Sequence, residues 1–279
     1  MVETKGLNLN ELAKHFAQLH GRRNRIFQDI GPFLKMLCRV LMEAEELQDG
    51  IRKNKGVEVL APTFAKIVGW TVAVVNYFGN SFAGQTIAYW LSHKYPPGGF
   101  AYCGQARCGC DPAARPPVNL DSSLVTEAGA NRSLRSLQQD LWRCYCKVNT
   151  GHDNDWMMGR LYAEITEAIT HTMKMSASDD TIAHLEVGLA KELCDILAWT
   201  CSMASMLGLD VELATLEHYS KCCPDCSEIP CRCDHFADLR GQSKGASNQV
   251  LTAPPEWNLA VENQPRSGRG GGAPPRGGA

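Results

Sequence analysis

The sequence contains an internal repeat, and this repeat restricts the folds open to the chain more than any other feature. A group of three cysteines and one aspartate occurs twice with the same internal spacing, as Cys103, Cys108, Cys110 and Asp111 and then as Cys226, Cys231, Cys233 and Asp234. Aligning the halves backwards from these groups pairs Trp70 with Trp199, and it pairs Glu43 and Glu46 with Glu164 and Glu167. Self-similarity of this kind indicates two copies of one structural unit. We therefore expect a tandem duplication.

Length and composition suit two modest units. The chain has 279 residues, of which 44% are hydrophobic and 21% charged, enough for two units of roughly a hundred residues each. The net charge of -2 gives no general attraction to nucleic acid or anionic membranes. We find no apolar run of roughly 18 residues, the length of a membrane span, and residues 1–6 do not resemble a signal peptide. We expect a cytoplasmic protein that makes no membrane contact.

Apolar residues recur at helical spacing in both halves, so the expected fold class is all-α. The predicted helices cover residues 9–24, 32–52, 63–78, 82–94, 133–148, 155–175, 179–207 and 210–220. Each unit thus contains four helices and ends in a small cysteine-rich segment. The expected organisation is a first unit at 7–111, a proline-containing linker at 112–131, a second unit at 132–236 and a disordered tail rich in Gly, Pro and Arg at 237–279.

Two pairs of acidic residues lie on neighbouring predicted helices of the second unit. Glu164 and Glu167 are three residues apart on one helix, and Glu192 and Asp195 are three apart on the next. Residues at this spacing share a helix face, so each pair can direct two carboxylates at one point. A single such pair is usually a solvated helix surface, but two pairs on adjacent apolar helices are much less expected by chance. Four converging carboxylates suit Mg²⁺ or Mn²⁺.

These residues resemble the metal-binding signature of the MazG-like nucleoside triphosphate pyrophosphohydrolases. The pattern Glu164-x-x-Glu167, followed by Glu192-x-x-Asp195, is similar to that signature. Residues 193–199 resemble the third helix of the family, and residues 207–212 resemble the turn that follows it. The resemblance covers about residues 133–219. The family often has a further glutamate before the first pair, where this chain has Ala163.

The resemblance implies two tandem MazG-like four-helix units that form an all-helical enzyme. Such an enzyme uses Mg²⁺ to cleave a nucleoside triphosphate between its α- and β-phosphates, releasing a monophosphate and pyrophosphate. The four acidic residues of the second unit would be the metal ligands and the catalytic groups. Members of the family commonly work as dimers with sites at the subunit interface. The duplication is therefore expected to be a fused pseudo-dimer, and a homodimer of the tandem unit is a further expectation.

The first unit keeps only half of this signature. Glu43 and Glu46 are retained, but the alignment places Thr63 at the position of Glu192 and Lys66 at that of Asp195. Losing two acids and gaining a cation should abolish divalent metal binding there. We expect the first site to be inactive, with Lys66 either facing a phosphate or lying on the surface as an ordinary lysine.

The cysteine groups suggest zinc. Four thiolates fall within eleven residues of the second unit, enough for a closed, structural zinc site. The expected ligands are Cys223, Cys226, Cys231 and Cys233, with Cys222 as an alternative to its neighbour. The first group, Cys103, Cys108 and Cys110, has Phe100 at the fourth position. Either His93 completes it or it binds zinc weakly. Five other cysteines are expected to be packing residues: Cys38, Cys144, Cys146, Cys194 and Cys201.

Substrate recognition is less defined by the sequence. Several residues are expected near the entrance to the acidic helices, but none is assigned a role: Trp142, Tyr145, Asp153, Asn154, Trp156 and Arg160. A second function remains open, namely a non-catalytic, zinc-stabilised interaction module whose Arg/Gly tail contacts RNA or another protein. A scaffold has no physical need to bring four carboxylates together, so the enzyme is the favoured hypothesis.

Overall fold

The computed structural model describes residues 8–24, 31–78, 85–95, 132–177 and 182–219, together with Cys223, Pro224 and Ser227. These residues form eight α-helices and no β-strand, which confirms the all-α fold class. The helices are α1 (Leu9–Asn24), α2 (Gly31–Arg52), α3 (Val57–Tyr77), α4 (Ile87–Lys94), α6 (Leu134–Asn149), α7 (Asn154–Ala177), α8 (Ile182–Met206) and α9 (Val211–Tyr219).

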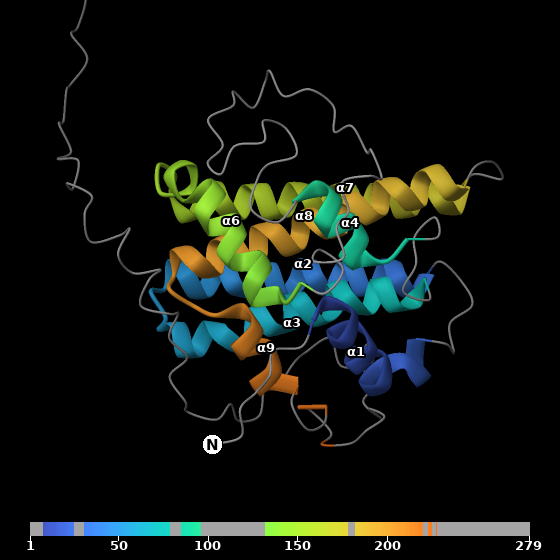
Figure 1. The fold of residues 1–279 in the computed structure, drawn as a ribbon, viewed down its shortest axis with the longest axis horizontal. Coiled ribbons are helices and arrows are strands. Elements are labelled where there is room, and N and C mark those ends of the chain that lie inside the picture. Colours follow the sequence, from blue (N-terminus) through green and yellow to red (C-terminus); the bar gives the residue numbers. More distant parts are fainter. Residues whose placement is uncertain are drawn as a thin grey trace, which may run out of the picture.

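Four long helices form the centre of the molecule. Helix α2 packs on α3, α3 on α8, α8 on α7, and α7 on α2, which closes the ring (Figure 1). The shorter helices lie outside this ring: α1 and α9 pack on α3, and α6 and α4 pack on α8. Helix α4 therefore reaches from the first half of the chain to the central helix of the second half, and α9 reaches the other way.

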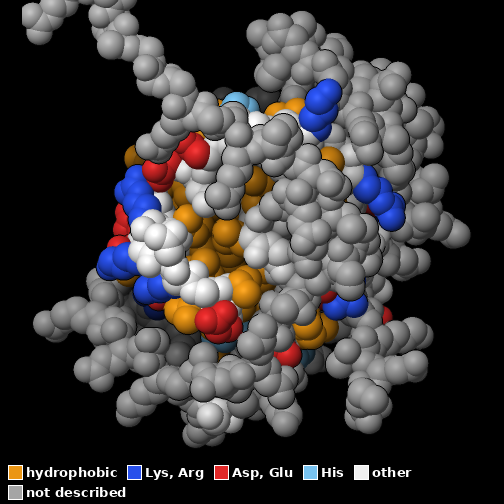
Figure 2. All heavy atoms as spheres, turned by 90° about the vertical axis from the view of Figure 1, so that its left-hand side faces the viewer, with side chains coloured by type: hydrophobic (Ala, Val, Ile, Leu, Met, Phe, Trp, Pro, Cys, Tyr) orange, Lys and Arg blue, Asp and Glu red, His pale blue; other side chains and the backbone are white. Residues whose placement is uncertain are grey.

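The buried apolar residues of both halves form one contiguous core. Phe16, Met36 and Phe64 of the first half are fully buried in it, together with Leu134 and Leu137 of the second half. Figure 2 shows the end of the molecule at which α3 and α7 begin, where hydrophobic side chains gather in the middle of the face and charged ones lie along its margin. The described parts of the two halves thus share a core instead of burying separate ones.

The first helices of the two halves begin beside each other. Asn8 caps α1, since its Oδ1 accepts from the backbone N–H of Glu11 at 2.9 Å, and Ser133 caps α6 in the same way through Ser136. These two capping residues face each other in an isolated antiparallel bridge. The adjacent Leu9 N–H donates to the carbonyl of Arg132 at 2.9 Å.

Helix α3 starts earlier than its sequence suggests. We predicted a start at Thr63, which directly follows Pro62, a residue that lacks the N–H that a helix interior requires. The helix begins at Val57 and contains Pro62, and its additional first turns bury Leu60 and Ala61 in the core. Burial of this apolar surface outweighs the cost of the proline.

Helix α3 is also long and apolar enough to cross a membrane by length and composition, contrary to our finding from the sequence that no run was long enough. Most of the relevant segment is buried inside the protein. It is surrounded by α1, α2, α8 and α9, the position of a core helix.

The turn between α8 and α9 follows its sequence signals. Gly208 has a φ of 71°, a left-handed conformation that glycine adopts at little cost. Asp210 then caps α9, because its Oδ1 accepts from the N–H of Leu213 at 3.0 Å. The two helices meet at 106°, so α9 turns away from α8 and packs on α3.

Candidate metal centre

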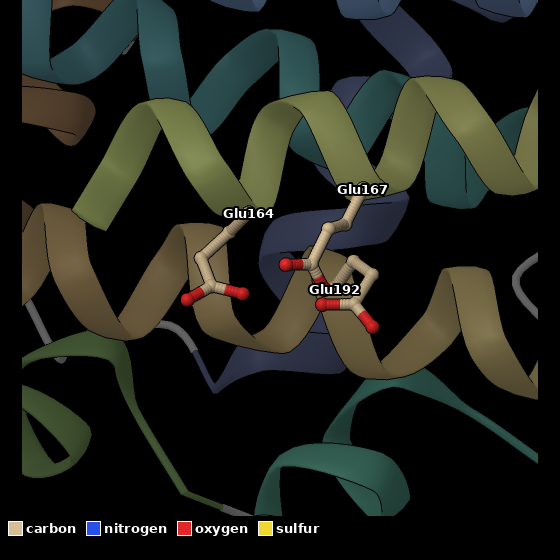
Figure 3. A group of neighbouring side chains, drawn as sticks. All are labelled: Glu164, Glu167 and Glu192. Carbon is tan, nitrogen blue, oxygen red and sulfur yellow. The ribbon is translucent and has the colours of Figure 1, made fainter. Parts of the chain in front are cut away.

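Three of the four predicted carboxylates converge between α7 and α8. Glu164 and Glu167 project from α7 and Glu192 projects from α8 toward the same point (Figure 3). One oxygen atom from each side chain can be chosen so that all three lie within 4.8 Å of one another. Glu164 is buried, Glu192 is half-buried and Glu167 is exposed, so the group opens to solvent on one side. Within the described ranges, it is the one such group of three or more acidic, histidine or cysteine ligands.

Burial and the neighbouring negative charges together raise the pKa of two of these carboxyls. The pKa of Glu192 rises to about 8, chiefly through burial and then through the negative charges of Asp195, Glu167 and Glu164, against the opposing effect of Lys94. Burial also raises the pKa of Glu164, helped by Asp195 and Glu167 and opposed by Arg160. A cation among these carboxylates would offset both causes, the desolvation and the repulsion.

Glu164 is held by two neighbours on the side nearer the start of α7. Arg160 forms an ion pair with Glu164, with 3.0 Å between Nη2 and Oε1. The indole Nε1–H of Trp199 donates to the same oxygen at 3.3 Å. The Arg160 guanidinium also lies over the Trp199 ring, 5.6 Å from its centroid. One oxygen of Glu164 is therefore fixed by hydrogen bonds, while the carboxylate stays beside Glu167 and Glu192.

Asp195 lies next to this group, but its carboxylate is engaged by the first half of the chain. Lys94, the last residue of α4, and Tyr95, which follows it, both donate to Asp195. Lys94 also donates to the Lys191 carbonyl at 3.3 Å. Burial lowers the pKa of Lys94, but the Asp195 carboxylate raises it, and the net direction is upward. Burial and Asp195 together raise the pKa of Tyr95.

The sequence reasoning missed three groups at this centre. Lys94 and Tyr95 could be found only from the packing of α4 on α8, which joins distant parts of the chain. His171 could have been predicted from the sequence, because it lies four residues after Glu167 and so shares its helix face. The His171 Nε2 atom lies 3.9 Å from Oε1 of Glu192.

The position in the first half that the sequence alignment pairs with this site contains an ion pair. The Lys66 ammonium lies 3.4 Å from Oε2 of Glu43 and 3.8 Å from Oε2 of Glu46. Glu43 is buried, and burial raises its pKa while Lys66 opposes this effect. The Lys66 side chain is 26% exposed, so it is a partly buried partner of two acids and not an ordinary surface lysine. Its positive charge occupies the place where a divalent cation would be needed.

The predicted zinc ligands lie almost entirely outside the described residues. This applies to Cys103, Cys108, Cys110, Cys222, Cys226, Cys231 and Cys233, and also to the linker and the tail. Cys223 is described and is buried. The N–H of Ser227 donates to the Cys223 carbonyl at 2.8 Å, and Ser227 has a φ of 58°.

The remaining predictions have mixed outcomes. Of the cysteines expected to pack in the helices, Cys144, Cys194 and Cys201 are buried and Cys146 is intermediate, but Cys38 is exposed. His93, considered as a zinc ligand, is buried with its Nδ1 atom 3.3 Å from the Tyr89 carbonyl.

The residues considered for substrate recognition fall into two groups. Trp142 is buried and Tyr145 is half-buried, so both belong to the packing of α6. Asp153, Asn154, Trp156 and Arg160 are exposed at the start of α7. Asp153 caps this helix, because its Oδ1 accepts from the Trp156 N–H at 2.8 Å.

Comparison of the chain with protein-family models, with curated proteins and with solved structures gives no match.

Proposed function

We propose that the protein is a Mg²⁺- or Mn²⁺-dependent nucleoside triphosphate pyrophosphohydrolase that cleaves between the α- and β-phosphates, giving a monophosphate and pyrophosphate. The observation that carries this proposal is the convergence of Glu164, Glu167 and Glu192 within 4.8 Å of one another. The resemblance of these residues to the MazG-like signature supplies the reaction class. The acidic residues were identified as a site before their distances were known.

The donor set suits a hard divalent cation. Mg²⁺ and Mn²⁺ prefer carboxylate oxygens and tolerate a partly open site that admits water and phosphate. Glu164, Glu167 and Glu192 would hold the ion, with Asp195 beside them as the fourth acidic group. When bound, such an ion offsets phosphate charge and lowers the pKa of a coordinated water.

The protein's own contribution is the placement of charge around the phosphates. Arg160 and Trp199 fix one oxygen of Glu164, so the carboxylate cannot rotate away from the site. Lys94 and Tyr95 hold Asp195 in the same way. Fixed charges that need no rearrangement during the reaction are the usual source of catalysis in phosphoryl transfer.

We further propose that the two halves are repeats that pack as a fused pseudo-dimer. The helix contacts support this, because exchanging the halves turns α1·α3 into α6·α8, and α4·α8 into α9·α3. Side-chain contacts support it as well. The Arg39 guanidinium lies 5.6 Å from the Trp70 ring centroid, as Arg160 does from that of Trp199.

The bridge between Asn8 and Ser133 fits this arrangement. Both residues cap the first helix of their half, and they pair with each other. In a twofold-symmetric dimer, equivalent residues meet at the symmetry axis. The pseudo-dimer would contain one working site, supplied with Lys94 and Tyr95 by the other half, and one site neutralised by Lys66. Zinc held by Cys223, Cys226, Cys231 and Cys233 remains part of the proposal as a structural element after α9.

The proposal is tested by turnover of a panel of nucleoside triphosphates, including dUTP and dCTP, with Mg²⁺ or Mn²⁺. The products should be monophosphate and pyrophosphate, resolved from single phosphate release. Glu167→Gln should lower kcat by at least about a hundredfold, since it removes a charge from the metal group. Glu46→Gln, the matched change in the first half, should keep kcat within about twofold, because Glu46 lies beside Lys66 and outside the group of Glu164, Glu167 and Glu192.

Both residues are exposed, so neither change should unfold the protein, and circular dichroism checks this. Release of single phosphate, or an active Glu167→Gln variant, would contradict the assignment of the site. If no nucleotide is turned over by the folded, metal-supplied protein, the non-catalytic interaction module becomes the better hypothesis.

A further inference from the structure

The start of α7 carries an exposed aromatic ring on the same helix face as the acidic residues. Trp156 is 37% exposed, although an indole has a large apolar surface that is normally buried. Counting along α7 in steps of three or four residues leads from Trp156 to Arg160, Glu164 and Glu167. Residues at these spacings lie on one side of a helix. The exposed indole is therefore in line with the carboxylates.

A second ring already lies flat on this indole. The imidazole of His152 stacks on Trp156 with 3.8 Å between ring centroids and 11° between the planes. His152 is exposed and belongs to the short turn between α6 and α7, where no regular helix holds it. The backbone N–H of Trp156 donates to Oδ1 of Asp153 at 2.8 Å, and the backbone N–H of His152 donates to the Asn149 carbonyl at 3.1 Å. The indole also has a second ring contact, with Trp199.

The indole is connected to the acidic group through direct contacts. The edge of Trp156 meets the ring of Trp199, with 5.7 Å between centroids and 75° between planes. Trp199 in turn donates to Glu164 at 3.3 Å, and Arg160 pairs with the same carboxylate. A planar ring on Trp156 would have a guanidinium and then the carboxylate group beside it, in that order along α7.

We propose that Trp156 binds the base of the nucleotide, which stacks on the indole in the place of His152. The phosphates would then extend past Arg160 toward Glu164 and Glu167. Stacking on an aromatic side chain accepts every base, because each base has a π-face. This inference rests on the proposed function for its ligand, but the stacking itself requires neither a metal nor turnover.

The test compares two ligands that share the phosphates and differ in the base. Full-length protein with Mg²⁺ is titrated calorimetrically with α,β-methylene ATP, which cannot be cleaved at the α–β position, and with inorganic tripolyphosphate. Trp156→Leu keeps an apolar side chain but removes the π-face. It should lower the affinity for α,β-methylene ATP by about tenfold or more. The affinity of Trp156→Leu for tripolyphosphate should equal that of the wild type. Trp156→Phe should bind both ligands nearly as tightly as the wild type does.

Two further variants complete the test. His152→Ala should bind α,β-methylene ATP as tightly as the wild type or more tightly, since the base no longer has to displace the imidazole. Met173→Ala changes an exposed side chain near the other end of α7 and should alter neither affinity. Weaker nucleotide binding in His152→Ala would overturn the displacement of the imidazole.

The failure of this inference is distinguishable from that of the proposed function. If Trp156→Leu releases pyrophosphate with a wild-type KM, the proposed hydrolase function is supported and the base site is overturned. Base-dependent binding that requires Trp156, in a protein without turnover, would support the base site and overturn the hydrolase. Equal loss of tripolyphosphate binding in Trp156→Leu, or no nucleotide binding by the wild type, would also overturn the base site.

Discussion

Two lysines, Lys66 and Lys94, pair with different acidic groups of the molecule. Lys66 stands between Glu43 and Glu46 on its own side of the chain. Lys94 instead crosses to Asp195 in the second half, and the cation that contacts the three glutamates there is Arg160, which pairs with Glu164. Both ammonium groups neutralise acids, but only the first occupies the space between the two carboxylates of α2. The position of the Lys66 ammonium thus distinguishes the ion pair with Glu43 and Glu46 from the candidate metal centre on α7 and α8.

At the residue scale, Glu192 predicts an unusual dependence of stability on pH. Its pKa is about 8 in the folded protein against about 4.3 in an unfolded chain. Between these values the folded state holds a proton that the unfolded state has lost, so the free energy of unfolding falls as pH rises. We expect a loss of about 1 kcal/mol per pH unit from pH 5 to 8 in metal-free protein.

Urea unfolding in the presence of a chelator measures this slope. Glu192→Gln should flatten it, because the amide does not titrate, while Glu46→Gln should leave it unchanged. A slope of the opposite sign in the wild type would show that Glu192 is ionised throughout this range.

Lys94 gives a second prediction at this scale. Its side chain is 17% exposed and that of Asp195 is 14% exposed, so Lys94→Ala leaves a largely buried carboxylate without its cation. The expected cost is on the order of 3 kcal/mol in the free energy of unfolding, measured by urea denaturation at pH 7. Lys53→Ala is the matched control, because the pair of Lys53 and Asp49 is exposed to solvent and should contribute little to stability. Equal effects of the two changes would contradict the structural role of Lys94.

At the scale of the elements, α3 and α8 differ in the residues that they present to α2 and α7. Helix α8 presents Glu192 and Asp195, and α3 presents Thr63 and Lys66 at the aligned positions. The double change Thr63→Glu and Lys66→Asp should therefore create a second divalent cation site beside Glu43 and Glu46. Titration of Mn²⁺ should yield about two bound ions per chain instead of one. A folded double variant that still binds one ion would contradict the alignment of the two helices.

The sequence predicted the elements better than their contacts. All eight described helices were expected, because their apolar residues recur with helical spacing. Gly208 and Asp210 predicted the turn before α9. The start of α3 was misplaced, because the helix extends through Pro62 to Val57 and buries Leu60 and Ala61. The i, i+3 spacings on two adjacent helices predicted four converging carboxylates, of which Glu164, Glu167 and Glu192 converge. The partners of Asp195 could not be predicted, since Lys94 and Tyr95 come from a distant helix that no local pattern connects to α8.

At the scale of the whole molecule, the shared core predicts that neither half folds alone. Helix α9 packs on α3, α4 packs on α8, and buried residues of both halves form one cluster. A fragment of residues 132–279 would expose the faces of α7 and α8 that normally contact α2 and α3. We expect it to be insoluble or without cooperative unfolding when expressed alone.

Coexpression of residues 1–121 with residues 122–279, which divides the chain within the expected linker, should restore a soluble one-to-one complex. Copurification through a tag on one fragment and a cooperative thermal transition measure this result. A fragment of residues 132–279 that unfolds cooperatively by itself would contradict the shared core.

The crossing of α4 onto α8 also affects what the chain can lose during evolution. In a dimer of identical subunits, any substitution that damages one site damages both. Here Lys66 pairs with Glu43 and Glu46, so a substitution of Lys66 would change the acidic pair of the first half without changing the carboxylates of α7 and α8. Deletion of the first half would remove Lys94 and Tyr95, the hydrogen-bond donors to Asp195. It would also remove α3, on which α9 packs. If the halves are the repeats that we propose, one gene keeps them at equal numbers and allows one half to specialise as a permanent accessory of the other.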